Sequence, residues 1–351
     1  MTDYKKGSAL PRGLSSATML YLGSVKDQID QFHMIIREPS GILHWFEVRR
    51  PELLKWCVHE NEVLSTDIKH QVASLDLATG RQSKGVRPEI MGILNVTPDS
   101  FSDGGQHFNP NVAIERAKEM VTEGVDILDI GGESTRPGAD LVSIEEEIDR
   151  VIPVIEGCKA LNVEISIDTR KMPVMNAAVA AGATMINDVS ALEFDENSLN
   201  FLASNTLPVC LMHSSADPKI MQINPEYKHV LLDVIDYLKR RIECCEEQGV
   251  DRNRIVVDPG IGFGKTLDHN LTLLKGLPFL RSLGCRILLG ASRKSFIGRL
   301  SSENRSENRI GGSIAAALYG AQAGADILRV HDVYETRQAV KIWQSIDRAS
   351  F

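Results

Sequence analysis

The sequence lacks long apolar runs. No stretch approaches the roughly 18 consecutive apolar residues of a membrane-spanning helix. Lys5 and Lys6 are followed by a polar stretch containing Gly, Ser and Pro, whereas a signal peptide would carry an apolar segment at this point. We therefore expect neither a signal peptide nor contact with a membrane.

The six cysteines form no C-x-x-C pair and show no spacing typical of a zinc site. Most of them lie in apolar patterns, which favours buried, reduced thiols and a cytoplasmic location. The net charge of −8 argues against broad binding to nucleic acid or to an anionic membrane surface. A local basic pocket is compatible with this charge, so small molecules are the expected partners.

From residue 89 onward, a short apolar strand, a polar or glycine-rich loop and a helical segment recur in that order. Eight strands are predicted, at residues 90–96, 126–130, 164–168, 184–188, 208–212, 254–258, 286–290 and 326–330. The helical pattern is clearest at 226–248, where apolar residues recur on one face. Strands that alternate with helices indicate a parallel sheet.

Eight such units over about 255 residues match a closed (β/α)8 barrel, or TIM barrel, whose usual size is about 250 residues. The alternative is an open, doubly wound sheet, which does not favour eight equal units. No G-x-G-x-x-G motif follows the first strand, and this weakens a dinucleotide-binding fold further. We therefore predict an α/β protein with a (β/α)8 TIM barrel over residues 89–347.

Residues 1–88 contain short mixed stretches and no repeat of the strand–helix unit. We predict that they form an N-terminal extension, whose role stays unknown. A cap over the N-terminal side of the barrel or an oligomer contact is the simplest interpretation. The polar run 79–85 is interpreted as a linker to the barrel.

Active-site residues of such barrels lie at the C-terminal ends of the strands. Every predicted strand brings a polar or charged group to that rim: Asn95; Asp129 and Glu133; Asp168; Asn187 and Asp188; His213; Asp258; Ser292 and Lys294; Arg329 and His331. Some of these can be helix N-caps, and Asp188 is the first candidate for that structural role. Lys294, Arg329 and His331 are poor caps, so the pattern predicts a polar site at this rim.

Several of these residues suit an anionic substrate. The loop at 130–139 combines glycines, which let a backbone approach a ligand, with Arg136, whose planar fork binds phosphate or carboxylate. Arg329 and His331 alternate on one strand and therefore point the same way, which suits a pyrophosphate. The segment 292–295 starts a helix whose N-terminus can bind an anion, and capping by Ser292 is the alternative.

Two acids, an amide and a lysine suit a neutral polar ring; they are Asp168, Asp258, Asn187 and Lys294. The two carboxylates can accept hydrogen bonds from the N–H groups of an aminopyrimidinone, and Asn187 and Lys294 can donate to its acceptors. A pterin or a purine therefore fits. Residues 258–266 end in Gly-Lys-Thr but lack the spacing of a phosphate-binding loop, which disfavours a nucleoside triphosphate. Asn95 and the carboxylates of the loop after it offer oxygens to Mg²⁺.

Seven motifs in this order resemble those of the dihydropteroate synthase family, over residues 89–346. They are the loop from Asn95, the Gly-Gly-Glu-Ser-Thr-Arg-Pro-Gly loop, Ile-Asp-Thr-Arg-Lys at 167–171, Ile-Asn-Asp-Val at 186–189, residues 258–265, Ser-Arg-Lys-Ser at 292–295 and Arg-Val-His-Asp-Val at 329–333. The resemblance implies a transferase that joins 6-hydroxymethyl-7,8-dihydropterin pyrophosphate to 4-aminobenzoate and releases pyrophosphate, in folate synthesis. Sulfonamides act in that family as aminobenzoate analogues.

The resemblance also implies a role for each matching residue. It places Mg²⁺ at Asn95, pterin at Asp168, Asn187, Asp258 and Lys294, pyrophosphate at Thr135, Arg329 and His331, and aminobenzoate at Phe101, Arg136, Pro137 and Ser295. Phe263 and Val330 are further substrate-binding positions. The implied catalytic residues are Asp103 near the breaking bond, Asp168, Arg136 and Lys294. Glu133 is expected to orient its loop without touching the substrate.

One departure from the family pattern lies after the fifth strand, where residues 213–218 read His-Ser-Ser-Ala-Asp-Pro in place of the usual His-Met and a glycine. Two other functions stay open: a pterin-dependent methyltransferase on the same barrel, and a pterin-binding subunit without catalysis. The intact loop at 130–139 favours the synthase. The resemblance further implies a homodimer through the late barrel helices, and residues 311–324 are rich in the small side chains that close helix packing needs.

Overall fold

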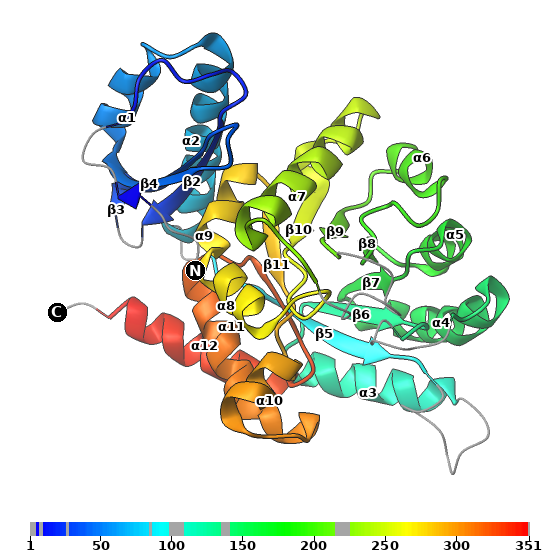
Figure 1. The fold of residues 1–351 in the computed structure, drawn as a ribbon. Helices are drawn as coiled ribbons and strands as arrows, with labels where there is room; N and C mark the ends of the chain where they lie inside the picture. The colour runs from blue at the N-terminus through cyan, green and yellow to red at the C-terminus, as the bar shows by residue number, and fades with distance from the viewer. Residues whose placement is uncertain are drawn as a thin grey trace.

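The structure, a computed structural model, describes residues 5–6, 10–25, 28–83, 86–97, 109–134, 141–214 and 225–349. The chain forms a closed barrel with helices around it and a smaller N-terminal part with its own sheet (Figure 1). No helix in these ranges combines the length and the apolar character needed to cross a bilayer.

The barrel contains the eight predicted strands. They are β5 (Glu89–Asn95), β6 (Ile127–Gly131), β7 (Glu164–Asp168), β8 (Met185–Asp188), β9 (Val209–Met212), β10 (Ile255–Asp258), β11 (Arg286–Leu289) and β12 (Ile327–Val330). Each strand pairs in parallel with its neighbours, and β12 pairs with β5 to close the ring. The predicted (β/α)8 TIM barrel is confirmed, and the open doubly wound sheet is excluded because the sheet has no free edge.

Helices follow the strands and surround the barrel. They are α3 (Pro110–Glu123), α4 (Ile144–Cys158), α5 (Met172–Ala181), α6 (Ser198–Ala203), α7 (Val230–Glu247), α8 (Leu267–Lys275), α9 (Leu277–Leu280), α10 (Ser295–Ser301), α11 (Ile310–Ala323) and α12 (Val333–Asp347), with short 3-10 turns η1 (Lys159–Leu161), η2 (Arg252–Arg254), η3 (Arg281–Leu283) and η4 (Ser306–Arg309). The helix predicted at 226–248 begins at Val230, because the side chain of His229 caps its first turn.

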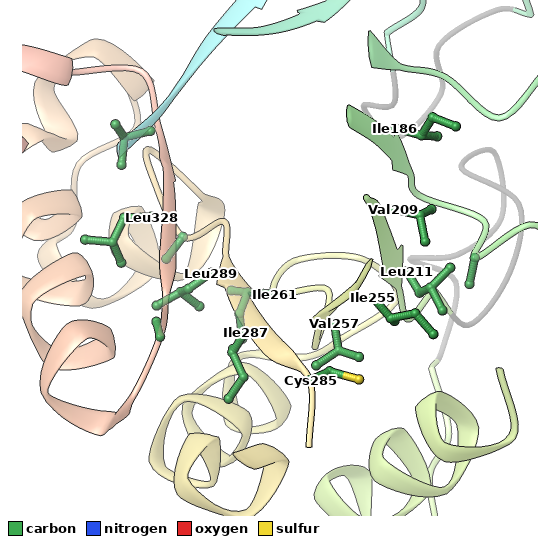
Figure 2. Close-up of a cluster of buried hydrophobic side chains, with 14 of the residues drawn as sticks. Ile186, Val209, Leu211, Ile255, Val257, Ile261, Cys285, Ile287, Leu289 and Leu328 are labelled. Carbon is green, nitrogen blue, oxygen red and sulfur yellow. The ribbon is translucent and has the colours of Figure 1, made fainter. Parts of the chain in front are cut away.

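Side chains alternate between the two faces of each strand, as the period of two requires. Outward residues such as Leu211, Val257 and Ile287 fill the space between the strands and the helices (Figure 2). Inward residues form a separate apolar floor made of Met91, Ile127, Met185, Cys210, Val256, Leu288 and Ile327. The next inward positions along several strands are polar, so the barrel carries its charged side chains above this floor.

The N-terminal part holds a four-stranded sheet of β1 (Lys5–Lys6), β2 (Met19–Val25), β3 (Gln28–Arg37) and β4 (Leu43–Arg49), in the order β1-β4-β3-β2, followed by α1 (Arg50–Cys57) and α2 (Glu62–Ser83). One face of the sheet packs on these helices through residues such as Leu22 and Met34. The opposite face contributes Tyr21 and Ile35 to the core of the barrel. The sheet is therefore buried on both faces.

Polar contacts fix this extension to α7, beside which it lies in Figure 1. The Tyr21 hydroxyl donates to Asp236 Oδ1 at 2.9 Å, and Arg37 donates to Asp233 at 3.2 Å. The sheet and α2 also contact α9 and η3, and η3 directly precedes β11. The extension therefore packs mainly against the side of the barrel. It reaches the N-terminal end of a strand at η3, so the expected cap over the N-terminal side of the barrel is present only there.

Residues 79–83 are the last five residues of α2, so the interpretation of 79–85 as a linker is wrong for them. The Thr79 hydroxyl donates to the Leu75 carbonyl at 2.8 Å, as a helical threonine does. Residues 84 and 85 lie outside the described part of the chain.

Candidate active site

Three predicted residues meet with Asp129 at the C-terminal mouth of the barrel. Asp168 and Asn187 end the neighbouring strands β7 and β8 and are register partners. Arg329 of β12 donates through Nη2 to Asp168 Oδ2 and through Nε to Asp129 Oδ2, each at 2.6 Å. Asn187 Nδ2 donates to the same Asp129 oxygen at 3.2 Å. Two buried carboxylates thus share one guanidinium, which neutralises part of their charge.

Asp168 keeps one acceptor unused. Its Oδ1 is buried and has no hydrogen-bond partner among the described residues. Burial raises the pKa of Asp168 to about 7, Arg329 lowers it, and the nearby Asp129 raises it further. A buried oxygen without a donor is unfavourable, so this position is prepared to accept an N–H group from a ligand.

The turn after β10 forms another side of the mouth. Asp258 Oδ1 accepts from the Gly260 N–H at 2.7 Å, and burial raises the pKa of this carboxyl. Lys294 donates to the Ile261 carbonyl, and its Nζ lies 4.3 Å from the centre of the Phe263 ring. Burial lowers the pKa of Lys294 to about 8, against the raising effect of Asp258. Lys294 and Phe263, which were predicted to bind substrate, therefore contact each other.

Asn95 and His331 line one cavity of about 650 Å³ beside β5 and β12, which also includes Arg293. His331 Nδ1 lies 3.0 Å from the Ser292 hydroxyl, which also accepts from the His331 N–H at 3.2 Å. Arg329 and His331 thus have different partners. A shared role on a pyrophosphate stays a prediction.

Two capping expectations need correction. Ser292 does not cap α10, whose N-cap position is Lys294 and which shows no side-chain cap; Ser292 holds His331 in its place. Asp188 does not cap a helix either, because α6 begins only at Ser198. Its carboxylate accepts from the N–H groups of Ser190 and Leu192 at 2.7 and 3.0 Å and so closes the turn after β8. Its role is structural, as expected.

Glu133 lies in a buried cluster of charges at the base of the loop after β6. It accepts from Arg170 Nε and Lys171 Nζ, each at 3.2 Å, and from the Val142 N–H at 3.1 Å. Lys171 also donates to Glu147 at 2.6 Å. These contacts join residues on both sides of 135–140, which is what a residue that orients this loop requires.

Five predicted site residues lie outside the described part of the chain: Phe101, Asp103, Thr135, Arg136 and Pro137. The altered run 213–218 is described only at His213 and Ser214. Val330 belongs to the core between the barrel and its helices, so its side chain lies apart from the mouth. Ser295 is exposed at the first position of α10.

Two buried charged residues of the mouth were not among the predicted site residues. Asp129 is noted above as a polar strand end, yet its contact with Arg329 joins positions 200 residues apart. A carboxylate inside an apolar strand is the signal that points to it. Lys265 is 4% exposed. In the sequence it stands out only as part of a run that resembles a phosphate-binding loop. Its burial depends on contacts that the sequence does not reveal.

No three His, Cys, Asp or Glu side chains within the described ranges gather closely enough to hold a metal ion. Asn95 nevertheless offers one hard oxygen donor at the mouth, and Mg²⁺ is commonly held by one or two protein ligands together with substrate phosphates. Asn95 therefore fits Mg²⁺ as part of a site completed by a phosphorylated substrate.

Comparison with known proteins identifies the family of the chain. Residues 91–331 match the pterin binding enzyme family. The chain is 48% identical to the dihydropteroate synthase of Neisseria meningitidis serogroup B over 266 residues, which are 74% of this chain and 93% of that relative. The chain belongs to the dihydropteroate synthase family. The family predicted from the motifs is thus confirmed.

Solved dihydropteroate synthases share the barrel. The enzyme of Xanthomonas albilineans with 4-aminobenzoic acid matches with a TM-score of 0.72 and 48% identity, over 75% of this chain and 94% of that chain. A complex of the enzyme from the same organism with 7,8-dihydropteroate matches with a TM-score of 0.69 and 46% identity, over 75% and 95%. The N-terminal extension precedes the range matched by the family.

Proposed function

We propose that this protein is a dihydropteroate synthase, which joins 6-hydroxymethyl-7,8-dihydropterin pyrophosphate to 4-aminobenzoate and forms 7,8-dihydropteroate and pyrophosphate. The observation that carries the proposal is the unused, buried Oδ1 of Asp168 beside Asn187, in a chain of this family. The X. albilineans structures, named for 4-aminobenzoic acid and 7,8-dihydropteroate, support the same substrates here.

The described residues suit a pterin by their hydrogen-bonding capacity. Asp168 and Asp258 are acceptors for the N–H groups of the ring. Lys294 and Asn187 are donors for its ring nitrogen and carbonyl oxygen. Phe263 offers an aromatic face, on which Lys294 already lies. A site built to pair each polar group of a ring rejects rings that leave these groups unpaired.

In the reaction, the bond between the methylene carbon and the pyrophosphate oxygen breaks, and its electron pair leaves with pyrophosphate. The electron-rich dihydropterin bears the resulting positive charge, which the carboxylate of Asp168 stabilises across the ring. The neutral arylamine nitrogen then forms the new bond to carbon and releases a proton to water. Binding both reactants in one mouth supplies much of the rate. The roles of Asp103 and Arg136 rest on the family motifs alone.

Mg²⁺ is the proposed metal. Asn95, at the end of β5, would hold it together with oxygens of the substrate. When bound, Mg²⁺ would neutralise charge on the leaving pyrophosphate. Arg329 and His331, from the last strand and the residue after it, would bind the pyrophosphate from the protein side.

A homodimer is the proposed assembly. An apolar groove of about 480 Å³ lies between α8, α10 and α11, and Leu271, Leu300 and Tyr319 line it. These three side chains are 38%, 58% and 47% exposed. Gly312, Ala315 and Ala316 line the α11 side of the groove with small side chains, which leave room for a close approach. An exposed apolar patch of this kind is typical of a protein interface.

The proposed location is the cytoplasm, since all six cysteines are free thiols. Sulfonamides are expected to compete with 4-aminobenzoate, because they are its analogues in this family.

The decisive experiment supplies dihydropterin pyrophosphate and labelled 4-aminobenzoate, with and without Mg²⁺, and measures labelled pteroate. Product that depends on both substrates and on Mg²⁺ is the expected result. No pteroate at any substrate concentration would overturn the proposal. Methyl transfer from methyltetrahydrofolate to a corrinoid would instead favour the methyltransferase, and pterin binding without any turnover would favour a binding subunit.

A second measurement tests the order of steps. Pyrophosphate release from the pterin substrate in the absence of 4-aminobenzoate is expected if the leaving group departs first. Cleavage that depends completely on 4-aminobenzoate would show a concerted displacement.

A further inference from the structure

The turn between β10 and α8 carries Phe263, and side chains from outside the turn contact its backbone. Gly260 and Gly262 have φ of +67° and +83°, a region that favours glycine. A Cβ on Gly260 would lie 1.9 Å from the His213 carbonyl oxygen. The turn therefore packs directly on the chain that leaves β9. Contacts from beneath must set where Phe263 lies.

Lys265 supplies the first of these contacts. Its Nζ donates to the Phe263 carbonyl at 2.8 Å and to the His213 carbonyl at 3.3 Å, and lies 3.0 Å from His213 Nδ1. An ammonium has three N–H donors, so these three bonds use all of them. Lys265 is 4% exposed and has no donor left for a substrate. Burial lowers the pKa of Lys265 to about 7, and these hydrogen bonds offset part of the cost of burying its charged form.

The ring of His213 is a suitable hydrogen-bond acceptor for Lys265. Burial, followed by the charge of Lys265, lowers the pKa of His213 to about 3, so the ring is neutral and its Nδ1 accepts from Lys265. The His213 ring packs edge-on against Tyr237, with centres 4.9 Å apart, and near Tyr227, at 5.9 Å. The ring is thus held in place by two aromatic side chains.

Tyr227 supplies the second contact. Its hydroxyl donates to the Gly264 carbonyl at 2.8 Å. Lys265 and Tyr227 therefore hold the consecutive carbonyls of residues 263 and 264. On the opposite side, Lys294 bonds to the Ile261 carbonyl and lies over the Phe263 ring. The position of Phe263 is coupled to both groups.

We propose that Lys265, His213 and Tyr227 are positioning residues for the pterin site: they hold the turn beneath Phe263, and so set the affinity for pterin without touching it. The inference rests on the proposed function, since it takes Phe263 and Lys294 as walls of that site. It assigns a role to three residues that the predicted site does not include.

The test measures binding of 6-hydroxymethylpterin by calorimetry and, separately, the KM for 4-aminobenzoate at saturating pterin substrate. Lys265→Met keeps the length of the side chain but removes its donors, and Tyr227→Phe removes one hydroxyl. Lys265→Met is expected to weaken pterin binding by about 10- to 100-fold and Tyr227→Phe by about 3- to 10-fold, as the loss of a charged and a neutral hydrogen bond predicts. The KM for 4-aminobenzoate should change less than about 3-fold in both, because the hydrogen bonds described above join these two residues to the turn and to His213.

Tyr237→Phe is the matched control. Tyr237 packs on the same His213 ring, but its hydroxyl donates to Glu193 at 2.6 Å and not to the turn. It should bind pterin as the unaltered protein does. If Lys265→Met does not fold, Tyr227→Phe and Tyr237→Phe still decide the matter, because each removes a single hydroxyl.

The possible results distinguish a failure of the proposed function from a failure of this inference. An unaltered protein that binds no pterin would contradict the proposed function. An unaltered protein that binds pterin, with folded Lys265→Met and Tyr227→Phe variants that bind it equally well, would overturn this inference alone. Equal losses in pterin affinity and in the KM for 4-aminobenzoate would also overturn it, since they would indicate general damage to the mouth.

Discussion

At the scale of single residues, Lys294 has the most direct role that can be tested. Its half-buried ammonium lies between Asp258, the Ile261 carbonyl and the Phe263 ring. Lys294→Ala is expected to weaken pterin binding by about 10- to 100-fold, because a hydrogen bond from a charged group contributes roughly 1.5–3 kcal/mol. Calorimetric titration with 6-hydroxymethylpterin measures this. Lys118→Ala, at a half-exposed lysine of α3, is the control, and an unchanged affinity for Lys294→Ala would remove this residue from the site.

The pH dependence of pterin binding follows from three shifted residues. The pKa of Asp168, raised by burial to about 7, means that its carboxylate becomes an acceptor as pH rises through this value. Burial lowers the pKa of Lys294 to about 8 and the pKa of Lys265 to about 7, so both lysines lose their charge as pH rises further. Affinity should therefore be greatest near pH 7 and fall on both sides.

Variants separate the two limbs of this profile. Asp168→Asn should remove the fall on the acid side. Lys294→Arg should remove the part of the alkaline fall that lies near pH 8, since an arginine stays charged, and should leave the part that Lys265 causes near pH 7. A profile that is unchanged in both variants would show that other groups titrate.

At the scale of elements, the buried charges of Glu133, Glu147, Arg170 and Lys171 join the loop after β6 to the start of α4 and to the chain after β7. Lys171→Met would leave two buried carboxylates with fewer partners. We expect a loss of about 3–5 kcal/mol in the free energy of unfolding, as for other broken buried ion pairs. Urea denaturation followed by circular dichroism measures the change.

The control for this variant is Lys118→Met, which breaks an exposed pair with Glu115 at 2.7 Å. An exposed pair of this kind contributes about 0–1 kcal/mol. If Lys171→Met costs no more than this control, the cluster does not hold the loop.

At the scale of the whole molecule, the groove between α8, α10 and α11 should decide the assembly. Leu300→Glu places a charge in this apolar surface and is expected to weaken self-association by roughly tenfold or more, as losses at interface centres do. Sedimentation equilibrium measures it. Leu77→Glu, on an exposed position of α2 outside the groove, is the control. Equal association of both variants would show that the dimer, if present, uses another surface.

The N-terminal extension shows the limit of local patterns at this scale. β2 and β3 carry consecutive apolar residues, 20–22 and 34–36, and both faces of the sheet are buried because α2 covers one and the barrel covers the other. The end of α2 was predicted as a linker because its polar residues are also typical of loops. Local patterns do not reveal that the second face of the sheet packs beside α7.

The eight strands, the rim on which their polar ends meet, and the family could be predicted from the sequence alone. These depend on short-range periodicity and on contiguous motifs such as Asp-Thr-Arg-Lys at 168–171, which survive without knowledge of distant contacts. The fold of the whole chain is needed to show that Arg329 joins Asp129 to Asp168 and that Lys265 bonds to His213. Such contacts join residues up to 200 positions apart, and closure of the barrel, not local propensity, brings them together.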